Sequence, residues 1–316
     1  MSLYDLVIVG GGPAGLTAGI YGARARLKTL ILEKATPGGQ AHTTREMVNY
    51  PGFYQGTSGP ELMKKMADHA REFGAEFVKD EVTKVDLEGE IKLLSTRKGS
   101  KYRGKTVILA PGAEPRLLNI KGEKEFKGLG ISYCATCDAE FYEDLNVVVV
   151  GNGDAAIEDA VYITKFAKKV IVIVIHDEGI VDCNQASAEK AFANPKIEFV
   201  WNSVLAEIKG KDEVEAVVVK NLKSGDLTEI EASGVFIYVG TVPRTELLKG
   251  KVAMDERGYV ITNDMMETSV EGVYVVGDAR VKYLRQVVTA ASDGAVEKIA
   301  HLFRCWKLRD ASAPEE

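Results

Sequence analysis

The sequence lacks the features that mark membrane, secreted and nucleic-acid-binding proteins. Its longest apolar run, VIVIVI at 170–175, is far shorter than the roughly 18 to 20 residues that a membrane-spanning helix requires. The opening residues carry neither the basic segment nor the cleavage pattern of a signal peptide. A formal charge of −6 disfavours a nucleic-acid surface, because binding the phosphate backbone needs concentrated positive charge. We therefore expect a soluble, cytoplasmic protein that binds neither membranes nor nucleic acids.

Cysteine and histidine are also scarce. The chain has 4 cysteines in 316 residues, which disfavours a disulfide scaffold and favours a reducing compartment. Cys183 and Cys305 have no partner at a useful spacing, so we expect them to be small apolar or surface residues. The 4 histidines show neither metal-binding spacing nor a catalytic triad, and we predict no metal site.

Two segments share the order of a nucleotide-binding βαβ unit, and the chain is longer than one hydrophobic core usually organises. In each segment an apolar strand ends in a glycine turn that leads into a helix and a second strand. The first segment has these four elements at 5–9, 10–15, 16–26 and 29–33. The second has them at 146–150, 151–156, 157–167 and 169–175. A further strand is expected at 272–277 and a helix at 287–303. The pattern predicts an α/β protein with two Rossmann-like domains.

The first glycine turn has the pattern of a dinucleotide site. Gly10, Gly12 and Gly15 would let the backbone approach a pyrophosphate, whose charge is met by the positive end of the following helix. Glu33, at the end of the second strand, could accept a hydrogen bond from a ribose hydroxyl. These residues predict a dinucleotide ligand but do not by themselves separate FAD from NAD.

The remaining two cysteines form a single C-x-x-C pair, Cys134 and Cys137. Such a pair is typical of a redox disulfide, in which one thiolate attacks a substrate and its neighbour resolves the mixed disulfide. Asp138 follows directly and could exchange protons during disulfide reduction. Half a zinc site is the competing interpretation, but zinc usually needs four protein ligands and no second C-x-x-C or histidine pair is present. We therefore predict that Cys134, Cys137 and Asp138 carry the chemistry.

Six motifs together resemble the low-molecular-weight thioredoxin reductases. In chain order they are GGGPAGL at 10–16, GGQ at 38–40, NYPGF at 49–53, CATCD at 134–138, GVYVVGDA at 272–279 and RQVVTAASDG at 285–294. The resemblance covers nearly the whole chain and implies FAD as cofactor, thioredoxin as electron acceptor and a homodimer. It also implies that Cys137 faces the flavin and that Cys134 attacks the thioredoxin disulfide.

The resemblance also assigns residues to the FAD site. Segments 38–40 and Asn49 would lie along the cofactor, Asp278 would contact its ribityl and pyrophosphate region, and 285–287 would border the isoalloxazine. The predicted cofactor residues are Gly10, Gly12, Pro13, Ala14, Gly15, Glu33, Lys34, Gly39, Gln40, Asn49, Val82, Ala110, Gly112, Gly277, Asp278, Arg285, Gln286 and Val287.

The second glycine turn departs from the NADPH-dependent members of that family. It keeps the outline of the turn at 151–156, but where those members carry a His-Arg-Arg cluster this chain reads His176-Asp177-Glu178. No lysine or arginine lies between Lys169 and Lys190. Losing two charge-assisted hydrogen bonds to the 2′-phosphate would weaken binding by about 10²- to 10⁴-fold, so we expect NADPH to bind poorly.

Two electron donors fit this departure. In one, Asp177 or Glu178 accepts the ribose 2′-hydroxyl of NADH. In the other, which we favour, the flavin is reduced by ferredoxin, as in the pyridine-nucleotide-independent branch of the family. A flavin can collect single electrons and pass on the pair that a disulfide needs. The basic residues expected to dock an acidic ferredoxin are Arg280, Lys282, Arg285, Arg304, Lys307 and Arg309.

Other classes of function are disfavoured. A hydrolase or transferase has no support, because the sequence contains no nucleophile elbow or Walker loop. A ferredoxin–NADP-type flavoprotein can lack the cysteine pair, and a redox-sensing module would bind flavin without turnover. We predict a discontinuous FAD domain of residues 1–117 and 245–316 that encloses a central redox-disulfide domain of residues 118–244. Both are expected to be three-layer α/β folds.

Overall fold

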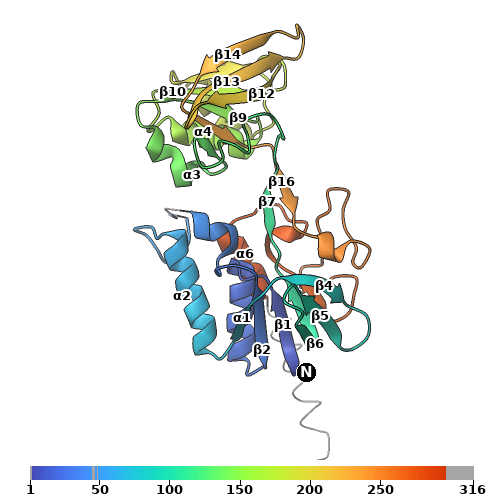
Figure 1. Cartoon of the computed structure of the whole chain (residues 1–316). Coiled ribbons are helices and arrows are strands. Elements are labelled where there is room, and N and C mark those ends of the chain that lie inside the picture. Colours follow the sequence, from blue (N-terminus) through green and yellow to red (C-terminus); the bar gives the residue numbers. More distant parts are fainter. Residues whose placement is uncertain (1, 45–46, 48, 297–316) are drawn as a thin grey trace, which may run out of the picture. The chain divides into compact units, whose positions relative to one another are not determined.

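The chain folds into two compact units, and it crosses between them twice (Figure 1). The computed structural model describes residues 2–44, 47 and 49–296, apart from the side chains of Thr43, Thr136 and Cys137. Unit 1 comprises Met1–Glu114 and Val242–Glu316, and unit 2 comprises Pro115–Thr241. The crossings thus fall after residues 114 and 241, instead of after 117 and 244 as expected from the sequence. At the crossings the short strands β7 (Ala113–Pro115) and β16 (Thr241–Pro243) pair with each other.

Unit 1 is built on a seven-stranded sheet with the order β3-β2-β1-β6-β5-β4, in which β17 pairs with the end of β6. Strand β1 lies parallel to β2 and to β6, while β5 and β4 form an antiparallel hairpin at one edge. The strands are β1 (Leu3–Val9), β2 (Thr29–Glu33), β3 (Glu76–Lys79), β4 (Val82–Asp86), β5 (Lys92–Thr96), β6 (Lys101–Leu109) and β17 (Val273–Val275). A parallel centre of this kind places the carboxyl ends of β1, β2 and β6 at one edge of the sheet, where cofactors bind in such folds.

Alternate side chains of these strands point to opposite faces and bury both of them. Leu6 and Ile8 of β1 pack against the helices α1 (Pro13–Arg24), α2 (Gly59–Glu72) and α6 (Val287–Ala295). Val7, between them, packs on the other face with residues of the β4–β5 hairpin. Helices α1 and α2 lie side by side along the sheet in Figure 1. Both faces of the sheet are therefore covered.

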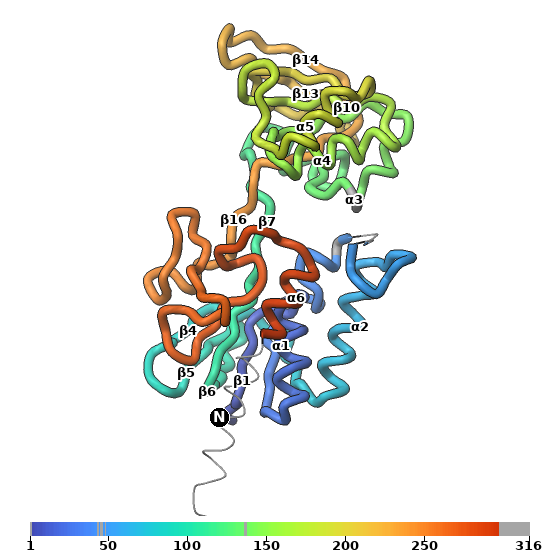
Figure 2. Tube along the Cα trace, turned by 180° about the vertical axis from the view of Figure 1, so that it is seen from behind, coloured from blue at the N-terminus to red at the C-terminus, as the bar shows by residue number. Residues whose placement is uncertain are grey.

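Unit 2 repeats this plan with a five-stranded parallel sheet of order β11-β10-β9-β15-β8. Val147 and Val149 of β9 face the helices, whereas Val148 and Val150 face a three-stranded antiparallel sheet. Figure 2 shows α4 and α5 on one side of this unit. The elements are β8 (Ile131–Ser132), α3 (Ala135–Asp138), β9 (Asn146–Val150), α4 (Asp154–Ile163), β10 (Lys169–Ile173), α5 (Gln185–Phe192), β11 (Ile197–Val200), β12 (Ser203–Gly210), β13 (Val214–Asn221), β14 (Leu227–Glu231) and β15 (Gly234–Ile237).

The structure confirms the predicted α/β class and corrects several element ends. The helix expected at 157–167 stops at Ile163, because the N–H groups of Lys165 and Phe166 bond three residues back and tighten the last turn. The helix expected at 287–303 ends at Ala295, and residues 297–303 of that range lie outside the described residues. Within the described part of the chain, no helix is long and apolar enough to cross a membrane.

Candidate functional site

The glycine turn after β1 is held by contacts that only glycine allows. Gly10 has a φ of 104°, and a Cβ there would collide with the carbonyl oxygen of Ala110. A Cβ on Gly15 would collide in the same way with the carbonyl oxygen of Gly10. At Gly12, by contrast, a Cβ would meet nothing closer than Gly39 Cα at 4.0 Å. Gly10 and Gly15 therefore pack the turn against its neighbours, while Gly12 leaves the backbone open to a ligand.

Helix α1 begins at this open position. Its N-cap is Gly12, which provides no side-chain cap, Pro13 occupies the first turn, and no acidic residue lies in that turn. The first N–H groups of a helix have no partner inside the helix, and its N-terminus carries partial positive charge. The end of α1 can therefore hold an anionic group such as a pyrophosphate.

Glu33 joins β2 to this turn. Its Oε2 accepts a hydrogen bond from the Gly11 N–H at 2.6 Å, and its Oε1 accepts one from the Ala35 N–H at 2.9 Å. Lys34, next to it, is exposed. Each carboxylate oxygen keeps a free lone pair, so Glu33 can shape the turn and still accept a ribose hydroxyl.

A second segment of unit 1, residues 38–49, contacts the glycine turn that follows β1. The Gly38 N–H donates to the Gly11 carbonyl at 2.7 Å, and Gln40 is exposed. Farther along, the Asn49 side-chain amide donates to Gln286 Oε1 at 3.1 Å. These contacts bring together residues of distant segments of the chain.

Asp278 has an unfilled hydrogen-bonding position. It follows Gly277, whose positive φ of 75° turns the chain after β17 next to Ala14 of α1. Burial raises the pKa of Asp278, although Lys282 and Arg285 act in the opposite direction. Its Oδ1 is buried and has no hydrogen-bond partner among the described residues. A bound group with hydroxyl donors, such as the ribityl chain of FAD, would supply that partner, so the residues present fit this cofactor.

Three other predicted cofactor residues lie apart from these contacts. Gly112 has a φ of 72° and open space where a Cβ would be. Val82 begins β4 and is buried in the cluster that includes Leu32 and Leu109. Val287 starts α6 and packs partly buried against the helix-side core. These positions show no contact that identifies a ligand, and their assignment stays a prediction.

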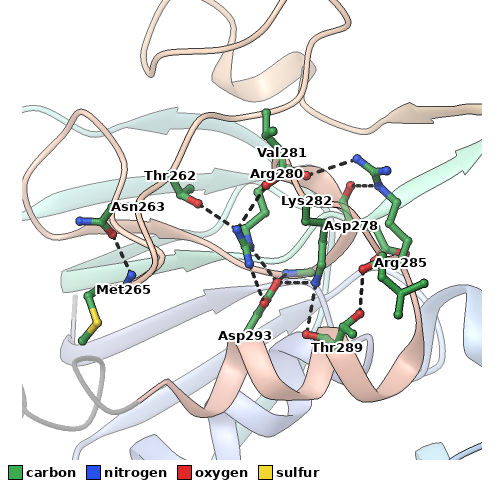
Figure 3. A network of polar contacts seen from close by, with 12 residues as sticks. Thr262, Asn263, Met265, Asp278, Arg280, Val281, Lys282, Arg285, Thr289 and Asp293 are labelled. Atoms are coloured by element: carbon green, nitrogen blue, oxygen red, sulfur yellow. Dashed lines mark hydrogen bonds and ion pairs between the residues drawn. The ribbon is translucent and has the colours of Figure 1, made fainter.

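Asp293, a residue that sequence reasoning missed, organises the loop that carries Asp278 and Arg285 (Figure 3). It is 4% exposed, and its Oδ2 accepts from the Gly277 N–H, Arg280 Nε and Lys282 Nζ at 2.8 to 2.9 Å. Its Oδ1 accepts from Arg280 Nη2 at 2.9 Å. Although burial disfavours its charged form, hydrogen bonds from Arg280 and Lys282 hold the pKa of Asp293 below the usual range.

This network corrects the expected ferredoxin-docking patch. The side chains of Arg280 and Lys282 are only 15% and 7% exposed, because both point inward to Asp293. Arg285 stacks on the Tyr259 ring at 4.2 Å and donates to the Asp278 carbonyl at 3.3 Å. Three of the six basic residues are thus engaged internally, and the prediction that they form a docking surface is wrong. Arg304, Lys307 and Arg309 lie outside the described residues.

The cysteine motif lies in unit 2, at the short helix α3. Cys134 is disulfide-bonded and forms the N-cap of this helix. The side chain of Cys137 lies outside the described part of the chain, so the Cys134–Cys137 pairing stays a prediction. Asp138 ends α3, and its Oδ2 accepts a hydrogen bond from Ser132 Oγ at 2.6 Å. Ser132 Oγ in turn accepts from the Cys134 N–H at 3.1 Å, so one hydroxyl links the predicted acid to the redox cysteine.

Cys183 differs from Cys134. It is a free thiol, and burial raises its pKa, with the nearby Asp154 acting in the same direction. A raised thiol pKa lowers the thiolate fraction, so Cys183 is a poor nucleophile. In the described residues, no group of three or more His, Cys, Asp or Glu side chains is arranged to hold a metal ion.

In unit 2, residues from a later segment of the chain bond to the glycine turn at 151–156. Gly153 forms a β-bridge with Asp182, whose N–H donates to the Asn152 carbonyl at 2.8 Å. The Asp182 carboxylate also accepts from the Asn152 side chain and lies 2.9 Å from His176 Nε2. Asp154, the first residue of α4, accepts from the Asn184 N–H at 2.7 Å. Two carboxylates therefore lie beside the helix end where a dinucleotide phosphate would bind.

The loop after β10 also differs from expectation. Asp177 forms an ion pair with Lys223, which comes from the turn between β13 and β14. Both side chains are more than half exposed. The absence of basic residues between Lys169 and Lys190 thus did not exclude a cation here, because Lys223 reaches the site from another part of the fold.

Comparison with known proteins finds relatives that match nearly the whole chain. Residues 4–294 match the profile of the pyridine nucleotide-disulphide oxidoreductase family. The thioredoxin reductase of Peptoclostridium acidaminophilum is 50% identical over 301 residues, covering 93% of this chain and 95% of that protein. The crystal structure of Lactococcus lactis thioredoxin reductase superimposes with a TM-score of 0.80 at 41% identity, covering 96% and 99% of the two chains. A ferredoxin-flavin thioredoxin reductase from Clostridium acetobutylicum is more distant, with a TM-score of 0.50, 29% identity and coverage of 98% and 99%.

The family is therefore clear from both sequence and fold. The expected FAD cofactor is confirmed by the match, since the members of this family are flavoproteins. The relatives with the higher identities are called thioredoxin reductases without mention of ferredoxin, which gives the ferredoxin-linked branch no support. The chain belongs to the pyridine nucleotide-disulphide oxidoreductases and, among them, to the low-molecular-weight thioredoxin reductases, which are flavin-dependent disulfide oxidoreductases.

Proposed function

We propose that this chain reduces thioredoxin through a Cys134–Cys137 disulfide that receives its electrons from FAD. The observation that carries the proposal is the placement of Cys134, a disulfide-bonded residue at the start of α3, one hydroxyl away from Asp138. A disulfide with an adjacent carboxyl group can accept an electron pair and exchange the protons that accompany it. The thioredoxin reductases at 41% and 50% identity support thioredoxin as the acceptor.

The FAD site of the proposal lies in unit 1. The pyrophosphate would face the Gly12 backbone and the N-terminus of α1, Glu33 would accept from the ribose, and Asp278 Oδ1 would accept from the ribityl chain. The paired side chains of Asn49 and Gln286 would border the cofactor. When bound, the flavin supplies the capacity to hold one or two electrons and to release them as a pair.

In this proposal the two cysteines have different roles in electron transfer. Cys137 receives the electrons on the flavin side, and Cys134 attacks the thioredoxin disulfide, as in the family that the chain resembles. Asp138 is held by Ser132 so that its carboxyl group stays next to the cysteine segment. Its role is to give a proton to the thiolate that leaves and to take it back when the disulfide forms again.

For the electron donor we favour a nicotinamide, and NADH over NADPH. The pyridine nucleotide family profile spans 4–294 and so includes the whole of unit 2. Asp177, in the loop after β10, would accept the ribose 2′-hydroxyl of NADH, and it already engages Lys223, the cation that could otherwise meet the 2′-phosphate of NADPH. Because Arg280 and Lys282 point inward to Asp293, they are not available to dock ferredoxin, which weakens ferredoxin as the alternative donor.

Ferredoxin remains the second candidate because of one feature of unit 2. The bridge between Gly153 and Asp182, together with the carboxylate of Asp154, occupies the turn that a dinucleotide phosphate would need. A nicotinamide donor has to displace this segment, whereas a protein donor does not. The homodimer also stays a prediction, which light scattering of the purified protein would test.

Anaerobic flavin reduction decides between the donors. NADH, NADPH and reduced ferredoxin are added to separate samples, and bleaching of the visible flavin band is timed. We expect NADH to bleach it fastest, and Asp177→Asn to reduce the NADH preference over NADPH by about tenfold or more through loss of a charged hydrogen bond. Glu229→Gln breaks a comparable exposed pair with Lys209 and should leave the preference unchanged. Bleaching by ferredoxin alone would overturn the nicotinamide proposal and establish the second candidate.

A further inference from the structure

A buried polar chain leads from helix α4 to the redox segment. The Ala135 N–H, directly after Cys134, donates a hydrogen bond to the Tyr238 hydroxyl at 2.9 Å. Tyr238 follows β15, and its hydroxyl is hydrogen-bonded to the carboxyl group of Asp159 on α4. A hydroxyl that accepts from an N–H can donate its own proton to a carboxylate. Asp159 is therefore linked to the Ala135 N–H both through the Tyr238 hydroxyl and directly.

The surroundings of Asp159 oppose a negative charge. Burial raises its pKa, with Glu158 on the same helix acting in the same direction, while hydrogen bonds from Tyr238 and the Ala135 N–H act against the shift. Burial also raises the pKa of Tyr238 well above its usual value, and Asp159 and Asp138 raise it further. The ionisable groups that act on this carboxyl group are thus Glu158 and Tyr238, and Asp138 of α3 acts on Tyr238, so that all of them are acidic. Its charge is therefore sensitive to any further negative charge nearby.

We propose that Asp159 is a positioning residue that takes up a proton when the neighbouring disulfide is reduced. The inference rests on the proposed role of Cys134 and Cys137. Reduction adds two electrons from the reduced flavin and breaks the S–S bond, after which one sulfur takes a proton and the other is a thiolate. The new thiolate adds negative charge next to Ala135, and Asp159 responds by binding one proton from solvent. Tyr238 transmits the effect through its hydrogen bonds to both ends of the chain.

The proposal has a consequence for the redox potential of the disulfide. At a pH where Asp159 is charged in the oxidised protein, its charge opposes formation of the thiolate and makes the disulfide harder to reduce. Removing that charge should favour reduction by about tenfold, which equals about 30 mV for a two-electron couple. Below the pKa of Asp159 the carboxyl group is already neutral, and the difference should vanish.

The test is a redox titration of the holoenzyme at several pH values. The protein is equilibrated in dithiothreitol buffers, its thiols are alkylated, and mass spectrometry gives the reduced fraction of Cys134 without reference to the flavin spectrum. Asp159→Asn and Tyr238→Phe are the test variants. Glu198→Gln, which removes an exposed carboxylate of the same unit that pairs with Lys169, and Tyr142→Phe, a tyrosine whose ring packs against Phe236, are the controls. Circular dichroism verifies that each variant is folded.

We expect Asp159→Asn to shift the equilibrium about tenfold toward the dithiol at high pH, with a gap that closes as the pH falls. Tyr238→Phe should shift it in part, and both controls should titrate like the unchanged protein. Equal potentials for Asp159→Asn and the unchanged protein at every pH would overturn the inference. If Cys134 shows no reversible titration even in the unchanged protein, the proposed function itself fails, so the two failures are distinguishable.

Discussion

Replacing Asp293 with asparagine is expected to destabilise unit 1 strongly. The Asp293 carboxylate is 4% exposed and is bound by two cations, Arg280 and Lys282, and by the Gly277 N–H. The substitution would leave both cations buried beside a neutral amide, which accepts hydrogen bonds through only one of its two polar atoms. Removing one partner of a buried ion pair costs about 3 to 5 kcal/mol. For a unit of this size that corresponds to a fall in melting temperature of about 6 to 20 °C.

The matched control is a surface carboxylate that has the same number of ion pairs. Asp68 on α2 is also bound by two cations, Lys64 and Arg71, but its side chain is half exposed. Solvent screens such pairs, so Asp68→Asn should leave the melting temperature almost unchanged. Because each carboxylate binds two cations, the difference in melting temperature between the two variants reports the effect of burial alone.

The assay is thermal unfolding followed by circular dichroism, together with titration of FAD into the FAD-free protein. Asp293 holds the Gly277 N–H and the loop before α6, so Asp293→Asn should weaken FAD binding as well as stability. If Asp293→Asn melts within a degree or so of Asp68→Asn, the network does not carry the stability that its burial implies. Unchanged FAD affinity in a destabilised variant would show that the loop is held by other contacts.

Three further outcomes follow from the same contacts. Gly12→Ala should fold normally and lose FAD, since a Cβ there fills the ligand side, whereas Gly15→Ala should fail to fold because its Cβ collides with the Gly10 carbonyl; solubility and flavin content of the purified variants check both. Cys134→Ser should abolish thioredoxin reduction while flavin bleaching by the donor persists, and an insulin-reduction assay measures the loss. The pKa of Asp293 is lowered in the folded state, so its contribution to stability is present above the unfolded pKa of about 4 and is lost as the pH falls through the folded pKa. Between about pH 6 and 3, the denaturant midpoint should therefore drop more in the unchanged protein than in Asp293→Asn.

Local sequence signals predicted the parts of the structure that depend on near neighbours. Strands 29–33 and 146–150 have the predicted bounds, because continuous apolar runs bounded by turn residues specify buried strands. The glycine turn at 10–15 was predictable for a similar reason. Its conformation needs residues without a Cβ at defined positions, and the flanking strand and helix fix its orientation.

The parts that sequence reasoning missed depend on contacts between distant segments. Lys223 meets Asp177 across 46 residues, and Tyr238 meets the Ala135 N–H across 103. The prediction of a basic docking face at Arg280 and Lys282 was wrong because the pattern of charge gave no sign that Asp293 would turn both side chains inward. A charged residue is most often solvated, and only the fold shows which ones are paired and buried.

The most direct test of the proposed function avoids the question of the donor. The holoenzyme is reduced chemically under anaerobic conditions, freed of excess reductant and mixed with oxidised thioredoxin, and the thioredoxin thiols are then counted. We predict that the protein transfers its electron pair to thioredoxin and that Cys134→Ser, with its flavin equally reduced, transfers none. Transfer at the same rate by both proteins, or by neither, would contradict the assignment of this chain's function to the Cys134–Cys137 disulfide.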